Sequence, residues 1–129
     1  MLKSVLIISA GASAGAVLRW LAGLALNKLH PLVAMGTLSV NLVGGYLVGL
    51  FISLFAFNPS IALEWRLLVI TGFLGALTTF STFSAEVVLL MQQGKLVAAF
   101  ANIALHVAGS LLMTFLGIYT FSLIKGLQP

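Results

Sequence analysis

Hydroxyl side chains are concentrated in one short stretch of this sequence, GALTTFSTFS, which runs from residue 75 to residue 84. The stretch holds five serines and threonines and two phenylalanines, but no charged residue. Hydroxyl groups donate hydrogen bonds, and the edge of an aromatic ring carries partial positive charge. Because the stretch has no acid, base or thiol, its chemistry favours the reversible binding of a passing ion over catalysis of bond formation or cleavage.

A second polar pattern lies nearer the C-terminus. Four polar residues recur there at intervals of four: Asn102, His106, Ser110 and Thr114. In a helix this spacing places all of them on one face. Such a stripe is harder to explain by isolated packing than a single polar residue would be, and it is suited to lining a pathway. His106 taken alone fits an interhelical hydrogen bond equally well, and one histidine is weak evidence for a metal site.

Three further polar residues lie in strongly apolar surroundings. Arg19 is expected ~12 Å deep, counted from Lys28, either as a snorkelling anchor or as a fixed charge that attracts anions. Asn41 is expected ~15 Å from Pro31, where its carboxamide either bonds a neighbouring helix or lines a pore. Glu86 is expected ~9 Å deep, counted from the Gln92 end of the third span. Its carboxyl group could cap a polar network, pair with a cation or carry protons.

The composition defines the elements that must position these groups. The chain has 129 residues, is 61% hydrophobic and 6% charged, and has a mean hydropathy of +1.21. These values predict an all-α integral membrane protein with four transmembrane helices in a single domain, residues 1–129. We expect the spans at residues 4–26, 32–55, 67–91 and 96–124, with the first retained rather than cleaved as a signal peptide.

Other classes of protein fit the composition poorly. The chain has no cysteine, which excludes disulfides and thiolate sites. Its six basic residues are scattered singly, so we expect no nucleic-acid partner. Glycines four apart, Gly11 with Gly15 and Gly45 with Gly49, predict close helix packing.

The third span is expected to be broken near the midplane. Glycine and threonine are poor helix formers, and hydroxyl groups compete for backbone hydrogen bonds, so residues 75–79 favour an interruption. That interruption would lie ~12–18 Å from Leu67, where unwound backbone persists only inside protein or along a cavity. Carbonyls freed there resemble the cation sites of broken transporter helices. Phe80 and Phe83 share a helix face, either as packing residues or as ring edges presented to an anion.

Basic residues are balanced between the two predicted ends of the molecule. Lys3, Arg66 and Lys125 lie at one end, against Lys28 and Lys95 at the other. So small a difference gives almost no preference for one orientation in the membrane. We therefore expect dual topology, which permits an antiparallel homodimer. The alternative is a single orientation set by Arg19 or by the surrounding lipid.

The motif GxxTTFSTFS, with GxxxR ending at Arg19 and NxxG beginning at Asn41, resembles the Fluc (CrcB) family of fluoride channels across essentially the whole chain. The resemblance implies a dual-topology antiparallel homodimer in the bacterial inner (plasma) membrane, with two fluoride pores lined by both subunits. It also implies a structural Na⁺ on the dimer axis, bound by the backbone carbonyls of Gly75 and Thr78.

The same resemblance implies roles for individual side chains. Phe80 and Phe83 match residues that contact fluoride, Asn41 matches the pore asparagine, and Ser110 matches a fluoride-coordinating serine. The remaining hydroxyls of the implied pore are those of Ser81, Ser84 and Thr114. Arg19 matches the arginine of the pore vestibule, and we place His106 with it there.

We therefore expect a passive, fluoride-selective channel that exports fluoride from the cytoplasm. One alternative is a proton-coupled exporter of hydrophobic cations, for which Glu86 is the sole candidate acid. Another is an accessory packing subunit without transport. An enzyme is not expected, because His106 and Glu86 have no nucleophile or metal set around them.

Overall fold

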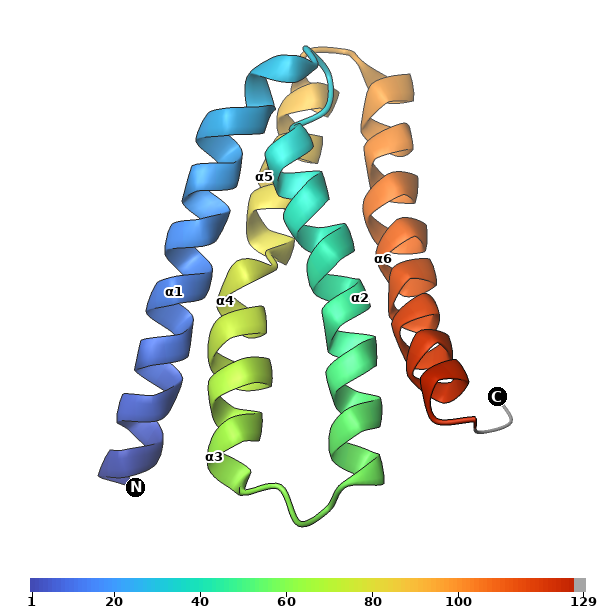
Figure 1. Ribbon diagram of the computed structural model, residues 1–129. Coiled ribbons are helices and arrows are strands. Elements are labelled where there is room, and N and C mark those ends of the chain that lie inside the picture. Colours follow the sequence, from blue (N-terminus) through green and yellow to red (C-terminus); the bar gives the residue numbers. More distant parts are fainter. Residues whose placement is uncertain (127–129) are drawn as a thin grey trace.

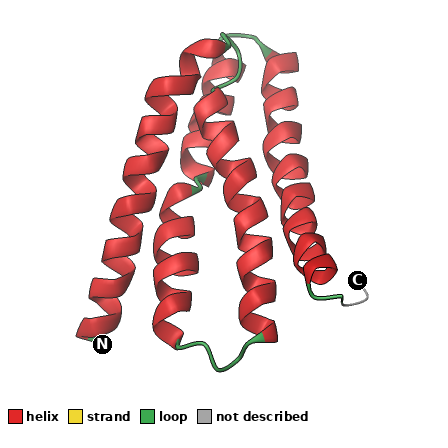
Figure 2. Cartoon of the chain, viewed as in Figure 1, coloured by secondary structure: helices red, strands yellow, loops and turns green. Residues whose placement is uncertain are grey.

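The computed structural model describes residues 1–126, which are folded as four long helical rods with no strand among them (Figures 1 and 2). Four segments are long and apolar enough to cross a membrane: Leu2–Leu29, Met35–Phe57, Leu63–Gln92 and Leu96–Ile124. The prediction of four membrane-spanning helices is confirmed, and the protein is a multi-pass membrane protein.

The first span is helix α1, Leu2–Leu26, followed by the short helix η1, Asn27–Leu29. The second is α2, Met35–Phe57, which begins three residues later than expected because residues 30–34, which include Pro31, form a non-helical connection. Asn27 Oδ1 accepts the backbone N–H of Gly36 at 2.8 Å and so caps the first turn of α2. The later start places Asn41 ~9 Å from the beginning of its helix instead of the expected ~15 Å from Pro31.

The third span, Leu63–Gln92, consists of four consecutive elements. They are α3, Leu63–Arg66; η2, a π-helix, Leu67–Leu74; α4, Gly75–Leu77; and α5, Phe80–Gln92. Between α4 and α5 the backbone is extended at two residues, with ψ of 154° at Thr78 and φ and ψ of −150° and 121° at Thr79. Figure 2 shows this segment as a short connection in the middle of the rod.

The predicted start of the third span was wrong by four residues, since α3 already begins at Leu63. Arg66, expected in the preceding loop, lies in α3 and donates a hydrogen bond to the carbonyl of Phe55 at 2.8 Å. That bond joins the two spans at the membrane end. The fourth span, α6, is Leu96–Ile124, as predicted.

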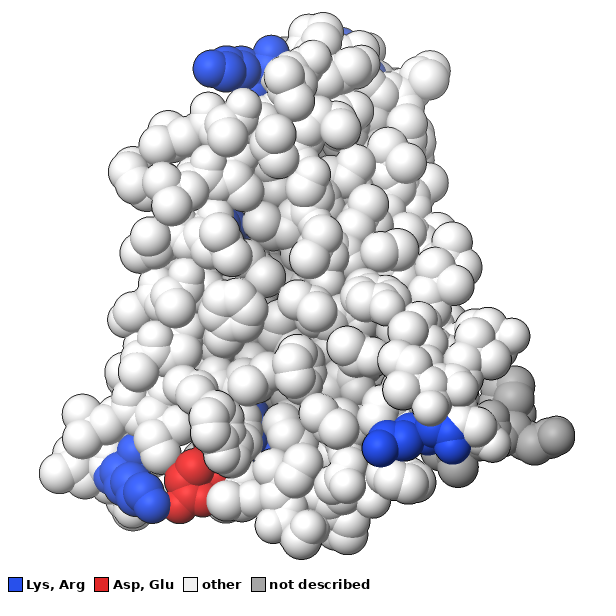
Figure 3. All heavy atoms as spheres, viewed as in Figure 1, with Lys and Arg blue, Asp and Glu red and all other residues white. Residues whose placement is uncertain are grey.

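Charged side chains gather at the two ends of the bundle. The N-terminus, the C-terminal end of α6 and the connection at 58–62 lie at one end, and the other two connections lie opposite (Figure 1). Figure 3 shows lysine and arginine side chains at both ends with a largely uncharged belt between them. Lys3 and Glu64 form an exposed ion pair of 2.7 Å at the end that carries the termini.

Helices α2 and α6 touch backbone to backbone through glycines. A methyl group added at Gly49 would collide with the carbonyl oxygen of Thr114, and one added at Gly117 would collide with the carbonyl oxygen of Tyr46. Gly45 is also in tight contact with α6, since its added methyl would lie 3.0 Å from the carbonyl oxygen of Ser110. Close packing at small residues is how helices associate in lipid, where no hydrophobic drive favours association.

Helix α1 and the third span also touch backbone to backbone through glycines. Methyl groups added at Gly11 and Gly15 would collide with the backbones of Leu68 and Phe73 respectively. The packing role predicted for both glycine pairs is therefore confirmed.

Gly49→Ala is expected to lower the free energy of unfolding by about 1–3 kcal/mol, because the added methyl must push α2 away from α6. Thermal unfolding in detergent, followed by tryptophan fluorescence, measures the effect. Gly23→Ala is the matched control, since its added methyl meets only the Asn27 side chain at 3.4 Å. Equal melting temperatures for the two variants would show that α2 and α6 are not in close contact.

Candidate functional site

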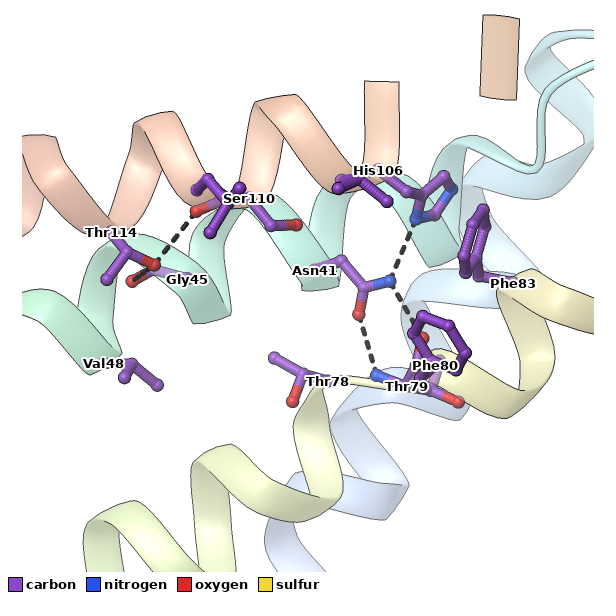
Figure 4. Close-up of a pocket in the computed structure, with 12 residues that line it drawn as sticks. Asn41, Gly45, Val48, Thr78, Thr79, Phe80, Phe83, His106, Ser110 and Thr114 are labelled. Carbon is purple, nitrogen blue, oxygen red and sulfur yellow. Dashed lines mark hydrogen bonds between the residues drawn. The ribbon is translucent and has the colours of Figure 1, made fainter. Parts of the chain in front are cut away.

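A groove of about 400 Å³ opens where the extended residues of the third span face α2 and α6 (Figure 4). We call it the Asn41 groove. Its walls combine amide, hydroxyl, imidazole and aromatic groups with a few aliphatic side chains. The lining residues are Asn41, Gly45, Val48, Thr78, Thr79, Phe80, Phe83, His106, Val107, Ser110, Leu111 and Thr114.

Asn41 holds the extended backbone in place. Its Oδ1 accepts the backbone N–H of Thr79 at 2.7 Å, and its Nδ2 donates to the carbonyl of Thr79 at 2.9 Å. The second hydrogen on Nδ2 is directed to Nδ1 of His106, 3.0 Å away. The carboxamide oxygen thus replaces the helical acceptor that Thr79 N–H lacks, as a buried backbone N–H requires. Figure 4 shows it reaching from α2 to both neighbours.

This bonding diverts two backbone amides from their helical acceptors. In a continuous helix, Thr79 N–H would bond the carbonyl of Gly75, but here it donates to Asn41. Likewise Thr82 N–H would bond the carbonyl of Thr78, but it donates to Thr79 Oγ1 at 3.1 Å, a helix N-cap. The carbonyls of Gly75 and Thr78, which were predicted to bind a cation, are therefore the two whose helical N–H donors bond to side-chain oxygens instead.

Two phenylalanines and the imidazole form an aromatic row at the groove. The rings of Phe80 and Phe83 meet edge to face with centroids 5.4 Å apart. Phe83 stacks on His106 at 4.5 Å, and both of these side chains are buried. Phe80 is 75% exposed, so the outer end of the row lies open in the single chain.

The predicted stripe on α6 divides into different roles. Asn102 lies outside the groove and donates to the carbonyls of Leu32 and Ala98, at 2.9 Å and 2.8 Å. His106, Ser110 and Thr114 do line the groove. The Thr114 hydroxyl lies 3.0 Å from the carbonyl oxygen of Gly45 on α2. It also lies 2.9 Å from the carbonyl oxygen of Ser110 in its own helix.

Two predicted pore hydroxyls do not line this groove. Ser84 donates to the carbonyl of Phe80 at 2.8 Å, within its own helix. Ser81 lies 3.3 Å from Thr79 Oγ1 and is exposed. The single chain therefore brings Asn41, Phe80 and Phe83 together but leaves both serines outside.

Arg19 lies in a second groove of about 490 Å³, lined by residues of α1, α2 and the third span. Its Nε donates to the carbonyl of Ala76 at 3.0 Å, and its Nη1 lies 3.5 Å from Thr82 Oγ1. The guanidinium therefore faces the third span and contacts both sides of the extended residues. The structure does not bring Arg19 and His106 into one groove, although Thr79 lines both.

Arg19→Leu is expected to lower the free energy of unfolding by about 1–3 kcal/mol, since it leaves the carbonyl of Ala76 without its side-chain donor. Arg19→Lys, which retains a donor and the charge, is expected to lose less. Melting temperatures in detergent measure both effects, with Lys28→Leu, at the membrane end, as the control for loss of a charge. If Arg19→Leu is no less stable than that control, the guanidinium does not support the backbone there.

Sequence reasoning missed three side chains that build this region. Asn27 caps α2, Thr79 caps α5, and Thr37 donates to Glu86 Oε1 at 2.6 Å. A polar residue just before a helix was the available signal for Thr79. No sequence signal pairs Thr37 with Glu86, because the two are 49 positions apart.

Comparison with known proteins gives consistent matches. The family model described as CrcB-like protein, Camphor Resistance (CrcB), matches residues 6–118. A protein of Tolumonas auensis, named fluoride-specific ion channel FluC, is 63% identical over 97% of this chain and 98% of its own length. Proteins with the same name from Pseudomonas putida and Chromobacterium violaceum are 60% and 58% identical, over 98% and 97% of this chain and 99% of their own lengths.

Proposed function

This chain belongs to the CrcB-like protein family, and we propose that it is a channel through which fluoride leaves a bacterial cell passively, giving fluoride resistance. The observation that carries the proposal is 63% identity over nearly the whole chain to a protein named fluoride-specific ion channel. The family and these names indicate an ion channel rather than an enzyme. We place it in the inner membrane.

The Asn41 groove supplies the kinds of group that a fluoride pathway needs. Fluoride is small and strongly hydrated, so a pore must replace its water with donors that do not hold it permanently. Amide, hydroxyl and ring-edge donors meet that need without a full positive charge. We assign the pathway to Asn41, Phe80, Phe83, Ser110 and Thr114, with Arg19 attracting anions from the vestibule.

A second copy of the chain completes this pathway in the proposal. Phe80 is 75% exposed and Ser81 is also exposed, although both lie in the middle of a membrane span. We infer that an antiparallel partner covers the groove, and that Ser81 and Ser84 of each subunit face the pathway built mainly by the other. Two pores per dimer follow from that symmetry.

The carbonyls of Gly75 and Thr78 fit a structural Na⁺. Hard cations prefer oxygen ligands, and these two carbonyls have lost their helical donors to Asn41 and to Thr79 Oγ1. The described residues contain no cluster of three acidic, histidine or cysteine residues that could hold a metal ion. A bound Na⁺ would supply positive charge that holds the two interrupted spans together at the dimer centre.

Fluoride efflux from proteoliposomes tests the function. Vesicles loaded with potassium fluoride and made permeable to K⁺ are expected to release fluoride rapidly, without a proton gradient. Absence of release from folded protein would contradict the proposal and favour an accessory subunit. Organic-cation uptake driven by a pH gradient would instead support the cation exporter, with Glu86 as its acid.

Subunit orientation is tested separately in the natural cysteine-free chain. Lys3→Cys and Lys28→Cys lie at opposite ends of one subunit, but an antiparallel dimer brings them to the same side of the membrane. Each variant is expected to react with an impermeant thiol reagent from both sides of the membrane. Reaction of each variant from one side only would contradict dual topology.

A further inference from the structure

The two ring nitrogens of His106 have different surroundings. Thr79 N–H donates to Oδ1 of Asn41, which fixes the orientation of the carboxamide and directs its NH₂ group to Nδ1 of His106. An NH₂ group only donates, so Nδ1 must accept and carries no proton. A neutral His106 therefore has its proton on Nε2.

That Nε2 is buried and has no hydrogen-bond partner. Within residues 1–126, the only other buried side-chain nitrogen or oxygen atom without a hydrogen-bond partner is Oε2 of Glu86. An unpartnered buried donor raises the free energy of the folded protein, so a small acceptor that reached it would bind favourably. His106 itself is 3% exposed and stacks on Phe83, which restricts rotation of its ring.

We propose that Nε2–H of His106 is a fluoride-binding donor, held in the required tautomer by Asn41. The inference rests on the proposed function and assigns His106 to the pathway rather than to the vestibule with Arg19. The His106 ring lines the Asn41 groove, one helical turn from Ser110 on α6. Figure 4 shows the second ring nitrogen on the side of His106 away from Asn41.

The burial of Nε2 also favours a small hydrogen-bond acceptor over a large one. Because the atom is closed to solvent, a ligand reaches it only when a neighbouring side chain moves, and Phe83 is the ring stacked against it. A small opening admits fluoride more readily than the larger chloride. Water is also small enough, so the experiment must distinguish fluoride from a resident water molecule.

Nitrogen NMR of ¹⁵N-histidine protein makes that distinction. The chain has two histidines, and His30→Gln leaves His106 as the only one. His30 is exposed and lies outside the groove, so this variant serves as the background. We expect a protonated Nε2, an unprotonated Nδ1, and a shift of the Nε2 signal as sodium fluoride is added, with no shift in sodium chloride.

Each other result has a defined meaning. A proton on Nδ1, or an Nε2 signal that ignores fluoride while the background protein still conducts it, overturns the inference and leaves the proposed function intact. Failure of the wild-type protein to conduct fluoride would instead overturn the proposed function.

Two substitutions separate the donor from the bulk of the ring. His106→Gln keeps an NH₂ group at the distance of Nε2, whereas His106→Asn places its amide near Nδ1 and lacks the distal donor. We expect efflux about tenfold lower for His106→Asn, which corresponds to one lost hydrogen bond, and closer to wild type for His106→Gln. Wild-type efflux from folded His106→Asn would overturn the inference.

Discussion

Asn41→Asp is expected to reduce fluoride efflux from proteoliposomes by about 100-fold or more, with the protein still folded. The aspartate keeps an acceptor for Thr79 N–H but replaces the NH₂ group with a second oxygen. That oxygen would face the carbonyl of Thr79 and Nδ1 of His106, both now bonded to Asn41 Nδ2. Loss of these two hydrogen bonds disturbs the extended backbone and the orientation of His106, and the added negative charge repels an anion.

Asn58→Asp is the matched control for this change. Asn58 also donates through its side chain to a backbone carbonyl, that of Leu54 at 2.9 Å, but it lies at the C-terminal end of α2, away from the groove. Efflux for this control is expected to stay within about twofold of wild type, since a surface change of this kind costs little free energy. If Asn41→Asp conducts as well as Asn58→Asp, the assignment of the pathway to the Asn41 groove is wrong.

Phe80→Ile is expected to lower fluoride efflux by about 10- to 100-fold. Isoleucine keeps apolar bulk but has no positive ring edge, so a dehydrated anion loses its partner at this position. Stability should change little within the single chain, because Phe80 is 75% exposed, and its ring meets that of Phe83 edge to face. Efflux and chromatographic homogeneity measured on the same sample separate conduction from folding.

Phe115→Ile provides a control of equal chemistry and similar exposure. Phe115 is 70% exposed on α6 but does not line the Asn41 groove. We expect this variant to conduct fluoride like wild type. An equal loss of fluoride efflux in Phe80→Ile and Phe115→Ile would mean that exposed aromatic rings are needed for assembly of the protein and not for contact with fluoride.

The helical framework followed from local information in the sequence. The fourth span agreed with the structure at both ends, because Lys95 and Lys125 flank a segment that contains no charged residue. The starts of α2 and α3 were less predictable. Asn27 caps α2 from nine residues away, and the third span extends past the apolar run to include Leu63 and Arg66.

The site was predictable as a set of residues but not as a network. Residue types and spacing identified Asn41, a polar residue in an apolar span, and the two phenylalanines, which lie among serines and threonines. Nothing local showed that Asn41 holds Thr79, which is 38 positions away, or that Phe83 stacks on His106. Such pairings depend on how α2, α5 and α6 pack, and the glycine contacts between α2 and α6 set that packing.

Selective, passive fluoride conduction is the central claim, and current through a planar bilayer tests it most directly. Wild-type protein is placed between solutions with a fluoride gradient and equal chloride, and the voltage of zero current is measured. The account predicts a reversal voltage at the Nernst potential of fluoride, unaffected by a pH gradient. A reversal voltage that follows chloride or protons, or no current from correctly folded protein, would contradict it.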